Sequence, residues 1–169
     1  MDSYEEAASN FKQAYGEDST YDMAIEIYEA YLDKDMEADG TRYLEAALSG
    51  NAKNAQDHCD RGRVYYYMDD YENATAELKQ AIDGDNTEAL ALLGMVYMDQ
   101  GDSANARTMF QQYVSQAENG AKGFNGLALC DIEDGDYDSA LSNISSGIHV
   151  ADAEDMQSLL FNEIAVYEK

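Results

Sequence analysis

The amino-acid sequence predicts an all-α fold of antiparallel helix pairs stacked along the chain, and three observations support it. A unit of about 34 residues recurs, with steps of 32 residues from Gly62 to Gly94 and 34 from Gly94 to Ala128. A period of this length is typical of stacked repeats. Apolar residues recur at helical spacing within the units. The 169-residue chain also contains no proline, the strongest helix breaker.

The unit at residues 87–120 shows the helix pair clearly. Apolar and small residues recur at i, i+3, i+4 and i+7 over residues 90–97, and a second amphipathic stretch follows. Between them, we expect Gly101 to end the first helix, and Asp102 or Ser103 to cap the second. Each unit is therefore predicted to be two antiparallel helices joined by a tight acidic turn.

Three of the units also have a small residue on the first helix and another twelve residues later on the second helix. A side chain larger than alanine would hold two crossing backbones apart, so we expect the helices to cross at these places. The residues are Gly62, Gly94 and Ala128 on the first helices, and Ala74, Ala106 and Ala140 on the second helices.

The same register predicts one array over residues 1–169. The unit at 21–54 is irregular, because Tyr28 replaces the small residue and residues 36–40 are expected to form a loose turn. The predicted segments are a second helix without its first at 4–16, repeats at 21–54, 55–86, 87–120 and 121–154, and a first helix without its second at 155–168.

Both ends of this array fall inside repeat units, so we expect the sequence to be an excerpt of a longer protein. The alternative is that the single helices are the end caps that stacked repeats need. The last helix favours a missing neighbour, because residues such as Leu160, Phe161 and Ile164 make it apolar on more than one face.

Several units carry a known signature, most completely in Leu90, Leu93, Gly94, Tyr97, Ala106 and Phe110. The pattern resembles that of the tetratricopeptide repeat family, in a bacterial type of protein. It departs from the family at Asp131, where tyrosine is usual, and at His58 and Arg61, where apolar residues are usual. The resemblance implies a right-handed α-α superhelix whose first helices line a concave groove. It also implies a scaffold that binds an extended peptide or a helix, without enzymatic activity.

In the family, certain positions on the first helices face the groove. At the matching positions, this sequence has acidic residues at one end of the array and mainly aromatic residues and methionines in the later repeats. Such a surface suits a protein or peptide ligand with Lys or Arg beside apolar anchors. The alternative is that methionines at helical spacing are core residues. The predicted groove residues are Asp22, Glu26, Glu29, Asp60, Arg63, Tyr66, Tyr67, Met95, Met98, Leu129 and Ile132.

Charge and composition exclude several classes of function. The 35 acidic and 10 basic residues give a net charge of −25, which repels nucleic acid and anionic membranes. No apolar run reaches the length of a membrane span, about 18 residues. The carboxylate clamp of chaperone-binding repeats is opposed by the acidic groove, where only Lys122 and Asn125 fit its chemistry.

No cofactor, metal site or catalytic site is expected. The metal-capable side chains at residues 57–60 diverge by about 100° per residue on a helix, so they do not converge on one ion. His58 and His149 have no nucleophile placed beside them. The second functional hypothesis is a structural spacer, or a module that self-associates through its terminal helices. The composition leaves open whether the protein is exported and surface-anchored or cytoplasmic.

Overall fold

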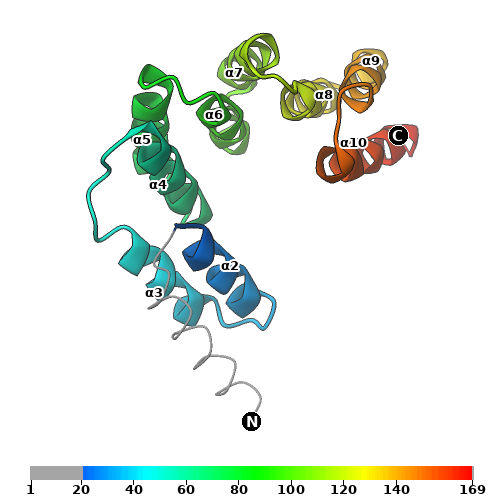
Figure 1. Cartoon of the computed structure of the whole chain (residues 1–169). Coiled ribbons are helices and arrows are strands. Elements are labelled where there is room, and N and C mark those ends of the chain that lie inside the picture. Colours follow the sequence, from blue (N-terminus) through cyan, green and yellow to red (C-terminus); the bar gives the residue numbers. More distant parts are fainter. Residues whose placement is uncertain (1–20, 169) are drawn as a thin grey trace.

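The computed structural model describes residues 21–168, so the helix predicted at 4–16 lies outside the described residues. The described part is entirely helical and forms a curved array (Figure 1). Its helices are α2 (Tyr21–Leu32), α3 (Glu37–Ala47), α4 (Ala55–Tyr67), α5 (Tyr71–Asp83), α6 (Glu88–Asp99), α7 (Ser103–Gln116), α8 (Ala121–Asp134), α9 (Tyr137–Ile148) and α10 (Ala153–Tyr167).

The helices pair in chain order as α2 with α3, α4 with α5, α6 with α7 and α8 with α9, followed by α10. The first helices α2, α4, α6, α8 and α10 also contact one another in sequence, so they line the same side of the array (Figure 1). This is the predicted all-α superhelix of helix pairs.

Small residues lie where the paired helices cross, as predicted. A Cβ atom added at Gly94 would lie 2.5 Å from the Phe110 ring, and one added at Gly62 would lie 2.6 Å from Leu78. Both distances are too short for a side chain, so glycine is needed for the observed spacing. In the first pair the arrangement is reversed, because Gly40 of α3 makes room for the large Tyr28 of α2.

The turns inside the helix pairs share one geometry. Gly101, Gly135 and Asp69 each have positive φ and end a first helix. Asp102 follows Gly101, donates its backbone N–H to the Tyr97 carbonyl at 2.8 Å, and caps α7 by accepting from the Asn105 N–H at 3.2 Å. This backbone bond is typical of a helix that ends in a left-handed residue.

The loose turn predicted at 36–40 is wrong. The turn ends at Met36 and α3 begins at Glu37, so Gly40 lies inside a helix. The reason is Asp35, whose φ of 56° closes the turn earlier than the glycine suggests. Met36 then donates its N–H to the Tyr31 carbonyl, as Asp102 does in its own turn.

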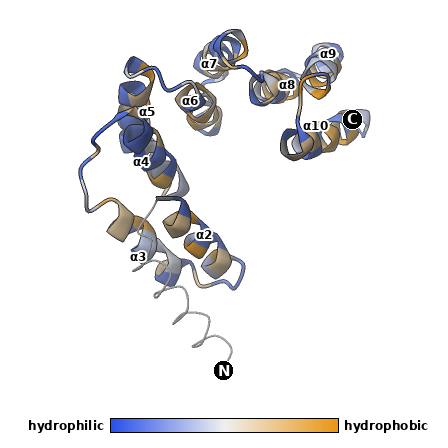
Figure 2. Ribbon diagram, in the orientation of Figure 1, coloured by the Kyte–Doolittle hydropathy of each residue, from blue (hydrophilic) through white to orange (hydrophobic). Residues whose placement is uncertain are grey.

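Each helix carries both hydrophobic and hydrophilic residues (Figure 2). The buried residues form a continuous series of clusters between the helices, with Leu44, Leu78, Phe110 and Ile144 among the largest buried side chains. Within the described part of the chain, every helix is too short or too polar to cross a membrane.

Candidate functional site

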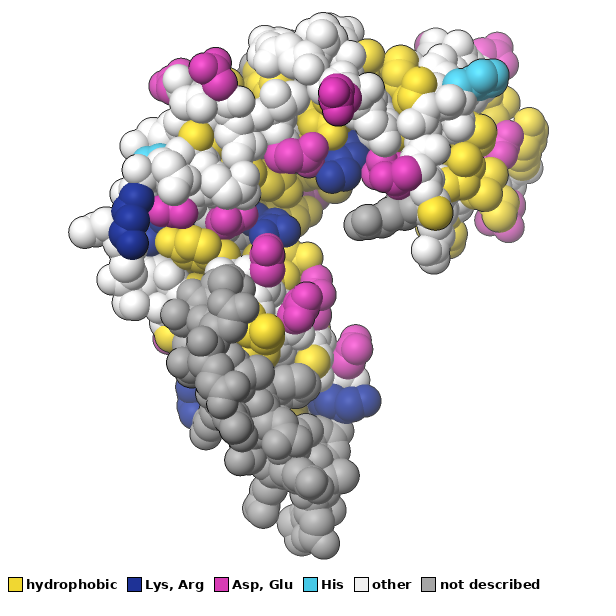
Figure 3. Space-filling view, viewed as in Figure 1, with side chains coloured by type: hydrophobic (Ala, Val, Ile, Leu, Met, Phe, Trp, Pro, Cys, Tyr) yellow, Lys and Arg dark blue, Asp and Glu magenta, His cyan; other side chains and the backbone are white. Residues whose placement is uncertain are grey.

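The concave side of the array holds a groove of about 520 Å³. Figure 3 shows this hollowed face, with acidic side chains gathered around hydrophobic ones. The first helices supply nearly all of its lining, and Phe110 of α7 adds part of its floor. We call this the concave groove; it is lined by Asp22, Gln56, Cys59, Asp60, Arg63, Glu88, Ala91, Leu92, Met95, Phe110, Ala121, Lys122, Asn125, Gly126, Asp155 and Ser158.

One end of the groove is organised around Arg63 of α4. Its guanidinium forms ion pairs with Asp22 of α2 and, at 3.4 Å, with Asp60 of its own helix. Gln56 also donates to Asp60, at 2.9 Å. Burial raises the pKa of Asp60, and these two donors offset only part of that effect. The Arg63 Nε atom is buried and has no hydrogen-bond partner among the described residues.

The other end of the groove repeats the pairing of charges between successive first helices. Lys122 of α8 donates to Glu88 of α6 at 2.9 Å. Glu88 also accepts from the Tyr113 hydroxyl of α7 at 2.8 Å. Asn125 of α8 and Asn162 of α10 are joined by a hydrogen bond of 2.7 Å, which links the next two first helices.

Apolar side chains lie between these polar ends. Leu92 and Met95 of α6 are half-buried, so part of each side chain faces the groove. Cys59 of α4 is buried, and burial raises the pKa of its thiol to about 11. The thiol is therefore protonated at neutral pH and acts as an apolar surface rather than as a nucleophile.

Four of the predicted groove residues line the concave groove: Asp22, Asp60, Arg63 and Met95. The other seven lie outside its lining. Glu26 and Glu29 are exposed on α2, and Leu129 is half-buried on α8. Met98 and Ile132 are half-buried and pack against core clusters, while Tyr66 and Tyr67 are half-buried on α4.

The tyrosines bind neighbouring helices. Tyr67 donates its hydroxyl to Glu29 of α2 at 2.6 Å, and its ring contacts Tyr28 with centroids 6.0 Å apart. Burial, and then the bond to Glu29, raise the pKa of Tyr67 to about 12. Burial also raises the pKa of Tyr66. These contacts hold α2 against α4 beside the groove.

Four residues that line the concave groove were not among the predicted groove residues: Gln56, Glu88, Asp155 and Ser158. Lys122 and Asn125 were considered only as members of a carboxylate clamp, which the acidic groove opposes. A usable signal was present, because Glu88 and Lys122 occupy the same place in successive repeats, 34 residues apart. Residues at that place face their counterparts along the line of first helices.

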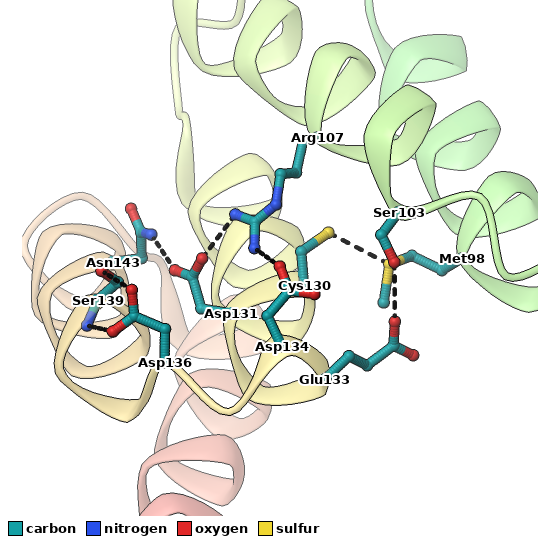
Figure 4. A network of polar contacts seen from close by, with 10 residues as sticks. All are labelled: Met98, Ser103, Arg107, Cys130, Asp131, Glu133, Asp134, Asp136, Ser139 and Asn143. Carbon is teal, nitrogen blue, oxygen red and sulfur yellow. Dashed lines mark hydrogen bonds and ion pairs between the residues drawn. The ribbon is translucent and has the colours of Figure 1, made fainter.

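A separate polar network includes Asp131, one of the residues that depart from the repeat signature (Figure 4). Asp131 of α8 is only 4% exposed and accepts from Arg107 of α7 at 2.5 Å and from Asn143 of α9 at 2.7 Å. Arg107 also reaches Asp134 at 2.7 Å. This network therefore joins α7, α8 and α9.

A family model for the tetratricopeptide repeat matches residues 59–124 and 92–145, which together cover just over half of the chain. The chain belongs to the tetratricopeptide repeat family. Tetratricopeptide repeat proteins are in general non-enzymatic scaffolds for interactions between proteins. In the part of the chain that the structure describes, no three His, Cys, Asp or Glu side chains gather as they would around a metal ion.

Solved tetratricopeptide repeat structures have a similar fold. TTC0263, a thermophilic protein of Thermus thermophilus, has a TM-score of 0.71 and 14% identity, covering 98% of this chain and 91% of that one. PilW, a type IV pilus biogenesis factor, has a TM-score of 0.64 and 18% identity, covering 98% and 82%. YrrB has a TM-score of 0.58 and 20% identity, covering 95% and 83%. A comparison with curated proteins finds no match.

Proposed function

We propose that this tetratricopeptide repeat protein is a non-enzymatic scaffold that binds an extended peptide segment of a partner protein in the concave groove. The segment carries Lys or Arg next to apolar side chains. The observation that carries the proposal is the groove lining itself, in which four carboxylates surround the apolar surface of Ala91, Leu92 and Met95.

The charge of the groove supports a basic ligand. Asp22, Asp60, Glu88 and Asp155 outnumber the two cations in the lining, Arg63 and Lys122, and each cation is paired with a groove carboxylate. The net charge of −25 raises the local concentration of cationic ligands further. A basic side chain would therefore enter a field that is negative both locally and overall.

The apolar part of the groove supports an anchor beside the basic residue. Met95 is unbranched and polarizable, so it can adapt to ligand side chains of different shapes. The fold similarity to YrrB, which is described as a tetratricopeptide repeat protein with an unusual peptide-binding site, supports a peptide as the class of ligand.

Selection from a phage-displayed library of random peptides tests this function. We expect the selected peptides to be enriched in Lys or Arg beside Leu, Ile, Met or Phe. For a selected peptide, fluorescence anisotropy should show weaker binding to Asp22→Asn/Glu88→Gln, by roughly three- to fivefold per removed charge. Glu72→Gln/Glu118→Gln changes the net charge equally at exposed positions outside the groove lining and is the matched control.

Two results would count against the groove. One is a selection dominated by acidic peptides. The other is equal weakening by the groove variant and by the control variant, because this would show that only the overall charge matters. A Met95→Ala variant separates the apolar contribution, and its loss of affinity should persist at high salt, where charge interactions are screened.

A second proposed function, self-association through the terminal helices, is favoured by the exposed apolar side chains of α10. Light scattering coupled to size-exclusion chromatography tests it directly. A monomer mass of 18.7 kDa at every concentration would exclude this function and leave the groove proposal intact.

A further inference from the structure

The last helix, α10, leaves one apolar face uncovered among the described residues. Leu160, Phe161, Ile164 and Tyr167 are 43%, 71%, 59% and 72% exposed. They recur at i, i+1, i+4 and i+7, so they form a single stripe along the helix. Leu159 and Val166 lie on the other side, buried against α8 and α9.

The register of α10 shows what this stripe corresponds to in a complete helix pair. Leu159 and Val166, seven residues apart, pack in the cluster that contains Ile144 of α9. In α6, Ala89 and Val96 have the same spacing and pack in the cluster that contains Leu78 of α5. The two helices can therefore be aligned on these buried pairs. Leu160, Ile164 and Tyr167 then match Leu90, Gly94 and Tyr97.

In α6, these three matched positions face the second helix of the same pair. Leu90 packs with Tyr113 of α7, Gly94 lies against Phe110 of α7, and Tyr97 packs against the cluster that contains Phe110. The exposed stripe of α10 is therefore the surface that a second helix covers in a complete repeat.

The chain contains a segment with the pattern of such a second helix. Ala7, Phe11 and Ala14 have the spacing of Ala106, Phe110 and Tyr113, and also that of Ala74, Leu78 and Ala81. This segment, residues 4–16, precedes α2, and α2 and α10 lie at opposite ends of the array (Figure 1). Because residues 4–16 directly precede α2 in the sequence, at the end of the array opposite α10, we look to a second copy as the source of a segment that covers α10.

We propose that α10 of one copy binds residues 4–16 of a second copy, so that two chains complete one tetratricopeptide repeat between them. This inference rests on the second proposed function and names its two surfaces. The contact is head-to-tail, because each copy contributes a different end. Such contacts build rings or open chains of copies rather than a closed two-fold dimer.

Ile164 occupies the position that a small residue, Gly94, has in α6. Its larger side chain is still compatible with this pairing. In α2, the large Tyr28 occupies the corresponding place and packs against Gly40 of α3. In residues 4–16, the larger Ala7 occupies the place of Gly40, and Ile164 in turn is smaller than Tyr28. A smaller partner for Ile164 than for Tyr28 is therefore not required.

Charge sets the conditions for association. Two copies with a net charge of −25 each repel one another. Raising the salt concentration from about 0.01 M to about 1 M shortens the Debye length from about 30 Å to about 3 Å. The contact itself is apolar, so we expect the mean mass to increase with salt. A contact made by ion pairs would weaken instead.

Mixing two complementary variants tests the pairing. Ile164→Asp spoils the α10 stripe and keeps residues 4–16, and Phe11→Asp does the reverse. By sedimentation velocity at high salt, each variant alone should be a monomer, whereas an equimolar mixture should form a species of twice the monomer mass. Ser142→Asp, at an exposed position on α9, adds the same charge and should assemble like the wild type. Circular dichroism checks that all variants are helical.

Other outcomes distinguish self-association in general from the specific pairing of α10 with residues 4–16. If Phe11→Asp alone still dimerises, α10 pairs with another α10 and the head-to-tail contact is overturned, while self-association stands. If the wild type is a monomer at every salt concentration, both self-association and this pairing are overturned. If the mixture of two monomeric, helical variants forms no heterodimer, the pairing of α10 with residues 4–16 is overturned.

Discussion

At the scale of single residues, polar side chains form hydrogen bonds at the places where the sequence departs from the repeat signature. Glu77 of α5 accepts from Arg61 Nε at 2.8 Å and is 2.6 Å from His58 Nδ1 of the same neighbouring helix, α4. Arg61 also donates to the Gly50 carbonyl at 2.5 Å and to the Leu48 carbonyl at 3.1 Å. This cluster therefore fixes the connection between α3 and α4 as well as the pairing of α4 with α5.

Glu77 should make stability depend on pH in the acid range. Burial opposes its charge, but hydrogen bonds with Arg61 and His58 outweigh burial and hold its pKa below the ordinary 4.5. A lowered pKa stabilises the fold above the unfolded value, and this contribution is lost as the pH falls through the folded value. Glu77→Gln should lower the free energy of unfolding by about 1–2 kcal/mol at pH 7.

Urea unfolding at a series of pH values checks this prediction. The difference between wild type and Glu77→Gln should be constant near neutrality and should shrink below about pH 4.5. Glu72→Gln, an exposed carboxylate on the same helix, is the control. A difference that grows on acidification would contradict the assigned direction of the pKa shift.

Asp131 should be more sensitive than an exposed aspartate. Replacing it by alanine leaves Asn143 and one Arg107 donor without their acceptor, so we expect a loss of about 2 kcal/mol in unfolding free energy. Asp131→Asn keeps one acceptor oxygen and should lose less. Chemical denaturation measures both, and equal losses would show that charge, rather than hydrogen bonding, carries the effect.

At the scale of the helices, the acidic turns act as caps. Asp70, Asp102 and Asp136 each accept from the backbone N–H three residues later, at 3.2 Å. Hydrogen bonds from Ser139 lower the pKa of Asp136. Much of the acidic character of the turns therefore comes from the starts of α5, α7 and α9.

Removing one cap gives a prediction for its helix. Asp102→Ala should cost about 1 kcal/mol, because the Asn105 N–H loses its acceptor at the start of α7. Asp102→Ser keeps a capping oxygen and should restore most of the loss. Thermal unfolding followed by circular dichroism measures both variants, and similar losses for both would argue against capping.

The helices and their crossings could be predicted because their signals are local and repeated. Small residues such as Gly94 and Ala106 occur at fixed spacing in successive units, and each is required by the close crossing of the two helices in its own pair. The early end of the α2–α3 turn could not be predicted, because Asp35 takes the left-handed conformation that glycine usually signals. The aspartate at Asp69 does the same.

The site was predicted less completely for a different physical reason. Whether a side chain faces the concave groove depends on the rotation of each helix, which is set by its neighbours and not by its own pattern. Glu88 and Asp155 line the groove, while Tyr67 turns to bind Glu29. The ion pair between Asp131 and Arg107 could not be predicted either, because Arg107 lies 24 residues earlier, in another repeat.

At the scale of the whole molecule, self-repulsion opposes the compact array. The net charge of −25 results from 35 acidic residues against only 10 basic ones. The melting temperature should therefore rise as salt increases from about 0.01 M to about 0.15 M, where screening shortens the Debye length to about 8 Å. The measurement should use the Ile164→Asp variant at low protein concentration, because association then does not contribute to the melting temperature. A melting temperature that falls with salt would show that the few ion pairs dominate.

The pattern of contacts in the array also has a mechanical consequence. Among the described helices, the main contacts join each helix to the next one or two helices in order. Because small rotations at successive interfaces add up along such an array, we expect slight shifts at each interface to change the width of the concave groove while every helix pair stays intact.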